Sequence, residues 1–236
     1  MRDTRRYNVR VPVALGVIGT ASGGALVGSW LDVGVVYPVM AAAMVAAALA
    51  LLVRLAGHQH PHRRFGAANA VTTTRVGLVA LVGALIGVEA GVRALWLAVG
   101  LASVGAALDG VDGWLARRTG LASEFGARFD METDALLILV LSVLVWQHGK
   151  AGAWVIACGL MRYGFVAAGR LLPWLAAPLR STVRGKTVAV VQMIGLVVAL
   201  APIIPVPYSV LVAAITLAAL AWSFAVDIAW LAKQES

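Results

Sequence analysis

The chain has 236 residues, of which 61% are hydrophobic and 13% are charged. Soluble domains are typically about 45–50% apolar and about 25% charged, so this composition excludes a soluble globular domain and a disordered chain. The formal net charge of +8 is explained by the cytoplasmic loops of a membrane protein, and we expect no nucleic-acid partner. The composition therefore predicts an all-α integral membrane protein.

Eight apolar stretches follow one another along the chain, separated by short segments of charged or turn residues. A spanning helix needs about 20 apolar residues, and the stretches have about this length. We therefore predict about eight transmembrane helices, at residues 11–31, 35–53, 69–88, 94–116, 130–147, 151–172, 187–204 and 208–231.

The distribution of Lys and Arg predicts the orientation of these helices. With an even number of spans, 14 of the 19 basic residues lie on one side, and Arg93 and Lys150 lie on the other. The remaining three, Arg75, Arg162 and Arg170, lie within predicted spans. The positive-inside rule then places both termini and the 117–126 loop in the cytoplasm, and the protein in the cytoplasmic (inner or plasma) membrane. The single cysteine, Cys158, lies in an apolar run, which indicates a packing residue and excludes a disulfide framework.

Four aspartates lie where an apolar helix should not carry charge. Asp109 and Asp112 share one face of the fourth predicted helix, and Asp130 and Asp134 lie one turn apart at the start of the fifth. A short loop makes these helices antiparallel neighbours, so the four carboxylates can converge. Divalent cations with oxygen ligands would relieve their repulsion. The alternative is that the aspartates only cap helices at the membrane interface.

The segments that carry these aspartates resemble a known family signature. Asp109-Gly-Val-Asp112-Gly113-Trp-Leu-Ala116-Arg117 and Gly126-Ala-Arg-Phe-Asp130-Met-Glu-Thr-Asp134 match every fixed position of the CDP-alcohol phosphatidyltransferase pattern D-x2-D-G-x2-A-R…G-x3-D-x3-D. Asn69-Ala-Val-Thr72-Thr-Thr-Arg75 is similar to the start of the first core helix of that family. The resemblance implies transfer of a phosphorylated group from a CDP-linked lipid donor to an alcohol acceptor among membrane lipids. It also implies a homodimer with its active site at the cytoplasmic membrane face.

The resemblance also implies a domain division and roles for individual residues. A six-helix membrane core would occupy residues 69–236, after an N-terminal transmembrane hairpin at 1–57 and a basic interfacial linker at 58–68. Asp109, Asp112, Asp130 and Asp134 would hold Mg²⁺ or Mn²⁺, as a pair of ions, and Asp134 would also act as the general base. The residues expected to bind CDP and its pyrophosphate are Asn69, Thr72, Arg75, Gly113, Ala116, Arg117 and Gly126.

Basic residues in the second half of the chain suggest a site for the acceptor. Arg162 and Arg170, with the Arg184-Gly-Lys186-Thr187 segment and Gln192, resemble parts of phosphatidylglycerophosphate synthases. We expect Arg162, Arg170 and Lys186 to bind the phosphate of an acceptor such as glycerol-3-phosphate or an inositol phosphate. The alternative for these side chains is interface anchoring by snorkelling.

Other functions stay open at this point. Within the enzyme class, the alternatives are transfer of a CDP-linked small alcohol to diacylglycerol and a cardiolipin-type synthase. Outside it, a transporter also carries charges within the membrane. A transporter would place them near the midplane on interrupted helices, whereas the aspartates here cluster around one predicted cytoplasmic loop.

Overall fold

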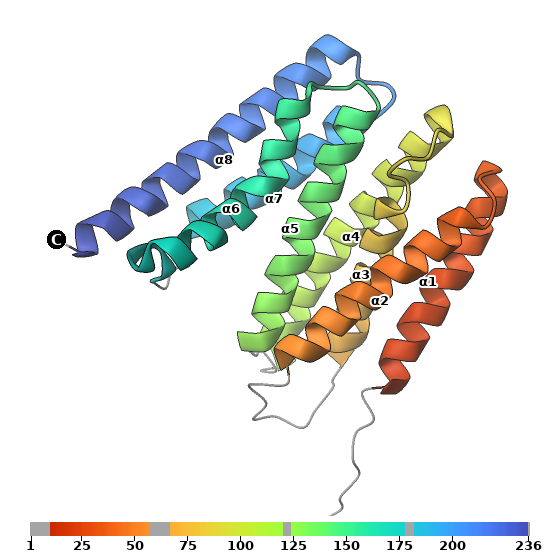
Figure 1. The fold of residues 1–236 in the computed structure, drawn as a ribbon, viewed down its shortest axis with the longest axis horizontal. Helices are drawn as coiled ribbons and strands as arrows, with labels where there is room; N and C mark the ends of the chain where they lie inside the picture. Colours follow the sequence, from red (N-terminus) through yellow and green to blue (C-terminus); the bar gives the residue numbers. More distant parts are fainter. Residues whose placement is uncertain (1–9, 57–66, 120–123, 178–181, 236) are drawn as a thin grey trace, which may run out of the picture. The chain divides into compact units, whose positions relative to one another are not determined.

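The computed structural model describes residues 10–56, 67–119, 124–177 and 182–235. Over these ranges the chain is all helical, as predicted, with eight α-helices and two short 3-10 helices at Ala153–Ile156 and Pro173–Ala176. The α-helices (Figure 1) are α1 (Arg10–Leu31), α2 (Val36–Ala56), α3 (Ala67–Gly83), α4 (Gly91–Thr119), α5 (Glu124–Gln147), α6 (Ala157–Leu171), α7 (Val183–Leu200) and α8 (Val206–Glu235).

Several of these helices have the length and composition of membrane spans. Among the described residues, three segments are long and apolar enough to cross a bilayer: Gly91–Gly110, Val183–Leu200 and Val206–Gln234. Val36–Ala48 of α2 and Thr73–Gly83 of α3 are shorter apolar helical segments. Large apolar side chains also lie on the outer surface, as lipid contact requires. The prediction of a membrane protein is confirmed.

The chain divides into two compact units, one ending at Asp134 and the other beginning at Ala135. In the first unit, α1 and α2 form a hairpin closed by a tight turn at Asp32 and Gly34, both of which have positive φ. The hairpin packs on α3. The Tyr37 hydroxyl donates a 2.6 Å hydrogen bond to the Leu81 carbonyl, and this bond fixes α2 against α3.

A small apolar cluster aligns the helices that carry the charged residues of the first unit. Val76 and Ala80 of α3 pack with Val45 of α2, and Phe129 at the start of α5 lies against them. Arg75, Asp130 and Phe129 are therefore adjacent to one packed cluster. The cluster sets the rotation of α3 and of the first turns of α5.

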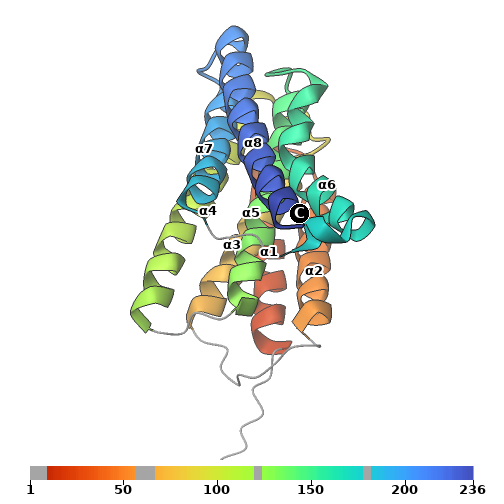
Figure 2. The same cartoon turned by 90° about the vertical axis from the view of Figure 1, so that its left-hand side faces the viewer.

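The second unit is built around the antiparallel pair α7 and α8, which lie side by side in Figure 2. Gly195 of α7 lies directly against Thr216 of α8. Gly159 of α6 is in similarly close contact with Leu139 of α5, where no side chain would fit. Small residues at these two positions let the helices approach closely, as is common in membrane bundles.

Lys150, which we predicted on the outer side, has a structural role. Its ammonium is buried and donates hydrogen bonds of 2.9 Å and 2.8 Å to the carbonyls of Ala201 and Ile204, just beyond the end of α7. The Ser209 hydroxyl donates to the Lys150 carbonyl at 2.6 Å. Burial and the nearby Lys150 charge lower the pKa of His148, which precedes it in the turn. This turn joins the ends of α5, α7 and α8.

The helix bounds differ from the predicted ones by five or more residues at three helix ends, those of α3, α5 and α6. α3 ends at Gly83, five residues early, and a turn follows that includes Gly87 at a φ of 82°. α6 begins at Ala157 instead of 151, because Gly149 at a φ of 65° and a 3-10 helix precede it. α4 and α5 extend into the predicted 117–126 loop, to Thr119 and from Glu124.

Candidate active site

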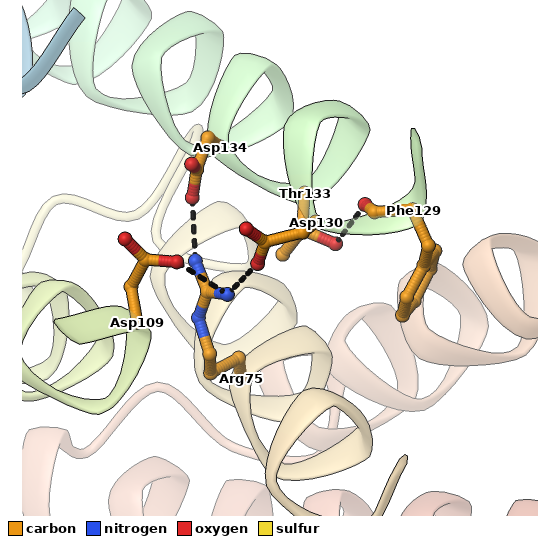
Figure 3. A network of polar contacts seen from close by, with 6 residues as sticks. All are labelled: Arg75, Asp109, Phe129, Asp130, Thr133 and Asp134. Carbon is orange, nitrogen blue, oxygen red and sulfur yellow. Dashed lines mark hydrogen bonds and ion pairs between the residues drawn. The ribbon is translucent and has the colours of Figure 1, made fainter. Parts of the chain in front are cut away.

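Three helices of the first unit bring four charged side chains together. Arg75 comes from α3, Asp109 from α4, and Asp130 and Asp134 from α5. Figure 3 shows the Arg75 guanidinium between the three carboxylates. Each carboxylate offers an oxygen, and these three oxygens lie within 4.8 Å of one another. The predicted convergence of Asp109, Asp130 and Asp134 is therefore present.

Helical periodicity and one local hydrogen bond arrange the carboxylates on α5. Asp130 and Asp134 are four residues apart and so face the same side of the helix. Thr133, between them, turns elsewhere and donates a 3.0 Å hydrogen bond to the Phe129 carbonyl. Phe129 itself packs into the cluster of Val45, Val76 and Ala80. The two acidic side chains thus stay available while their neighbours anchor the helix.

The guanidinium of Arg75 contacts all three carboxylates through its two terminal nitrogens. Nη1 pairs with Asp130 and lies 2.9 Å from Asp109, and Nη2 lies 2.5 Å from Asp134. Each contact uses the Oδ1 atom of the aspartate. Three negative charges thus face one positive charge, so this cluster keeps a net negative charge when all four groups are ionised.

The donor set suits a hard divalent cation. Carboxylate oxygens are the ligands that Mg²⁺ prefers, and they are also suited to Mn²⁺. Each carboxylate has about four lone-pair sites, so an aspartate that accepts from Arg75 still has capacity for a metal. The arrangement therefore fits a divalent metal site.

Other residues of the signature lie on the same helices, but the structure describes only the helices at these positions and not the side chains. Asp112 is on α4, three residues beyond Asp109. Asn69 and Thr72 lie on α3, ahead of Arg75. The same limit applies to Gly113, Ala116 and Arg117 of α4 and to Gly126 of α5.

Comparison with known families decides the class of the protein. Residues 65–226, more than half of the chain, match the profile described as CDP-alcohol phosphatidyltransferase. The chain belongs to the CDP-alcohol phosphatidyltransferase family. The match covers Arg75 and the three carboxylates, whereas α1 and α2 lie outside it. No solved structure was found that matches the chain.

Membership identifies the protein as a membrane transferase of phospholipid biosynthesis. CDP-alcohol phosphatidyltransferases move a phosphatidyl group from a CDP-alcohol to an acceptor, and they use divalent metal. The aspartate cluster is a group that can bind such a metal.

The basic residues predicted for the acceptor belong to the second unit of the transferase. Arg162 is half-buried in the second turn of α6, so it lies near the helix start and not at the middle of a span, where the predicted bounds of 151–172 place it. Arg170 is exposed in the last turn of α6, and Lys186 is exposed in the first turn of α7. The lone Cys158 is buried and unpaired by disulfide, as predicted for a packing residue.

Two ion-pair partners were not assigned from the sequence. For Asp227 of α8, the sequence left open a pair with an unspecified arginine or a place at the cytoplasmic interface. In the structure it pairs with Arg184 of α7, whose guanidinium also lies over the Trp222 ring at 5.7 Å. Arg75 was assigned only to the pyrophosphate, and its contacts with the carboxylates were missed. The antiparallel arrangement of α7 and α8 could have indicated the pair between Arg184 and Asp227, because it places the start of α7 beside the end of α8.

Proposed function

We propose that this transferase moves the phosphatidyl group of CDP-diacylglycerol to a phosphorylated alcohol, such as glycerol-3-phosphate or an inositol phosphate, and releases CMP. The observation that carries the proposal is the convergence of Asp109, Asp130 and Asp134, three signature aspartates, within 4.8 Å. The acceptor hydroxyl oxygen would attack the lipid phosphorus. The bond from that phosphorus to the CMP oxygen would break, and the hydroxyl proton would leave with a base.

The four signature aspartates would hold two Mg²⁺ or Mn²⁺ ions: Asp109, Asp112, Asp130 and Asp134. Bound ions of this kind neutralise phosphate charge and stabilise the leaving oxygen. Asp134 lies one turn beyond Asp130, and we assign it the role of accepting the proton of the acceptor hydroxyl. Its carboxylate is partly exposed, so a substrate hydroxyl can reach it.

The remaining signature residues would bind the CDP group. Arg117 has a guanidinium that suits bidentate contact with the pyrophosphate. Glycine at 113 and 126 allows the substrate to approach the backbone closely. Asn69, Thr72 and Ala116 complete the proposed binding set.

A phosphorylated acceptor is favoured by the basic residues of the second unit. Arg162, Arg170 and Lys186 can each pair with phosphate oxygens, and their spacing resembles phosphatidylglycerophosphate synthases. The excess of basic residues in one set of loops supports an active site and termini on the cytoplasmic side. A homodimer is expected from the family resemblance.

The test is CMP release by the purified protein from CDP-diacylglycerol with a panel of acceptors. Glycerol-3-phosphate or an inositol phosphate should support turnover, whereas glycerol, free inositol, phosphatidylglycerol and diacylglycerol should not. Arg162→Ala should raise the KM for the acceptor and leave donor binding unchanged. Arg93→Ala, which removes an arginine predicted on the outer side, is the matched control. Equal turnover with unphosphorylated alcohols would overturn the acceptor assignment.

A further inference from the structure

Arg75 is the most deeply buried charged group at the aspartate cluster. Its side chain is 2% exposed, whereas those of Asp109, Asp130 and Asp134 are 33%, 42% and 28% exposed. A group approaching from outside the protein therefore meets the carboxylates before it meets the guanidinium. The pattern of burial places Arg75 behind the carboxylates.

The contacts of Arg75 leave it little capacity for a substrate. Its two terminal nitrogens are engaged with three carboxylates. A pyrophosphate could bind those nitrogens only if ion pairs within a buried group were broken. Breaking such pairs leaves uncompensated charge away from water, which is strongly unfavourable.

The same contacts leave the carboxylates able to bind metal. Arg75 engages one oxygen, Oδ1, of each aspartate. A carboxylate accepts about four hydrogen bonds or metal bonds, so each aspartate keeps capacity for a metal ion beyond its contact with Arg75. Ligating carboxylates in metal sites are commonly held in this way by a hydrogen-bond donor behind them.

We propose that Arg75 is a positioning residue that orients Asp109, Asp130 and Asp134 for metal binding and does not contact the pyrophosphate of the donor. This proposal rests on the metal-dependent function proposed above. The positive charge of Arg75 offsets the repulsion among the three carboxylates. The planar guanidinium, with its N–H groups in a fixed geometry, also fixes the direction of the three carboxylates, which the ammonium of a lysine does not do. The chain thus assembles its ligands before a metal arrives.

The experiment measures Mn²⁺ affinity of the detergent-purified full chain, without nucleotide, by the loss of the free Mn²⁺ signal in electron paramagnetic resonance. Loss of the hydrogen-bond donor that holds a metal ligand typically weakens metal binding by about 10–100-fold, and we expect this loss of Mn²⁺ affinity for Arg75→Gln. Arg75→Lys keeps the charge without the planar guanidinium, so its affinity should fall between those of Arg75→Gln and the wild type. Arg93→Gln, which alters an exposed arginine in the first turn of α4, should bind Mn²⁺ like the wild type.

The outcomes separate this proposal from the proposed function. If the wild-type chain binds no Mn²⁺, the metal-dependent function itself fails. If it binds Mn²⁺ and both Arg75 variants bind equally well, Arg75 acts elsewhere and the inference is wrong. Tighter binding by Arg75→Gln would also overturn it, because the guanidinium would then be competing with the metal. If Arg75→Gln does not fold, weakened binding by Arg75→Lys supports the inference and unchanged binding overturns it.

Discussion

Packed apolar residues lie beside two of the charged side chains of the aspartate cluster, Arg75 and Asp130. Phe129 packs beside Val76 and Ala80, and this contact brings Asp130 of α5 next to Arg75 of α3. A mostly hydrophobic chain can hold four ionisable groups together because they compensate one another and because three of them stay partly exposed. Unpaired charges in this position would be costly.

At the residue scale, the role of Asp134 can be separated from metal binding. Asp134→Asn keeps the size of the side chain and its contact with Arg75 but removes the base. We expect turnover to fall by about 10²–10⁴-fold, the usual contribution of a general base, with little loss of donor binding. The measurement is single-turnover CMP release beside equilibrium binding of CDP-diacylglycerol. A parallel loss of binding and turnover would indicate a ligand role alone.

The aspartates were predictable from the sequence, whereas the contacts of Arg75 were not. Asp130 and Asp134 are one turn apart, so their shared face follows from helical periodicity alone. The position of Arg75 depends on how α3 is rotated against α4 and α5. That rotation is set by the packing of Val45, Val76 and Phe129, which involves residues far apart in the chain.

At the element scale, close helix packing in the second unit depends on glycine. A Cβ at Gly159 would lie 2.7 Å from both Cβ and Cδ1 of Leu139 and even closer to its backbone, whereas a Cβ at Gly164, on the same helix, meets nothing within 4 Å. Gly159→Ala should destabilise the protein by about 1–3 kcal/mol through overpacking. Gly164→Ala should be neutral or stabilising by up to about 1 kcal/mol, because alanine favours the helix.

Thermal unfolding of the two variants in detergent checks this prediction. A lower Tm for Gly159→Ala beside an unchanged or raised Tm for Gly164→Ala is expected. A similar increase in both would show that α6 and α5 do not pack closely at Leu139.

The ion pair between Arg184 and Asp227 gives a second prediction, which concerns the stability of the contact between α7 and α8. It joins the start of α7 to α8, and both side chains are about three-quarters buried. The cost of breaking it should lie between the about 0–1 kcal/mol of exposed pairs and the about 3–5 kcal/mol of buried ones. Arg184→Gln, Asp227→Asn and the double variant form a thermodynamic cycle. Strictly additive effects on unfolding in detergent would contradict the interaction.

Helix existence was predictable, and the exact bounds were not. Each of the eight apolar stretches overlaps one α-helix of the structure. The late start of α6 reflects the turn at Gly149 and the buried Lys150, whose ammonium bonds the carbonyls of Ala201 and Ile204. Residues 151–156 after this turn are apolar but include a 3-10 helix, so hydropathy alone does not place the start of α6.

At the scale of the whole molecule, the family match and the packing cover different parts of the chain. The match begins at residue 65, and α1 and α2 precede it. This hairpin nonetheless packs on α3, the helix that carries Arg75. The division at 1–57, 58–68 and 69–236 remains a prediction about domains, and the hairpin is a direct packing partner of the helix that contributes Arg75 to the aspartate cluster.

We propose that three carboxylates of this membrane transferase act through a divalent metal. The most direct measurement is CMP release from CDP-diacylglycerol and glycerol-3-phosphate by the purified chain, with Mg²⁺ or with EDTA, and for Asp109→Asn beside the wild type. We predict that EDTA abolishes turnover, that added Mg²⁺ or Mn²⁺ restores it, and that Asp109→Asn is inactive although folded. Full turnover in EDTA, or by Asp109→Asn, would contradict metal-dependent catalysis at these aspartates.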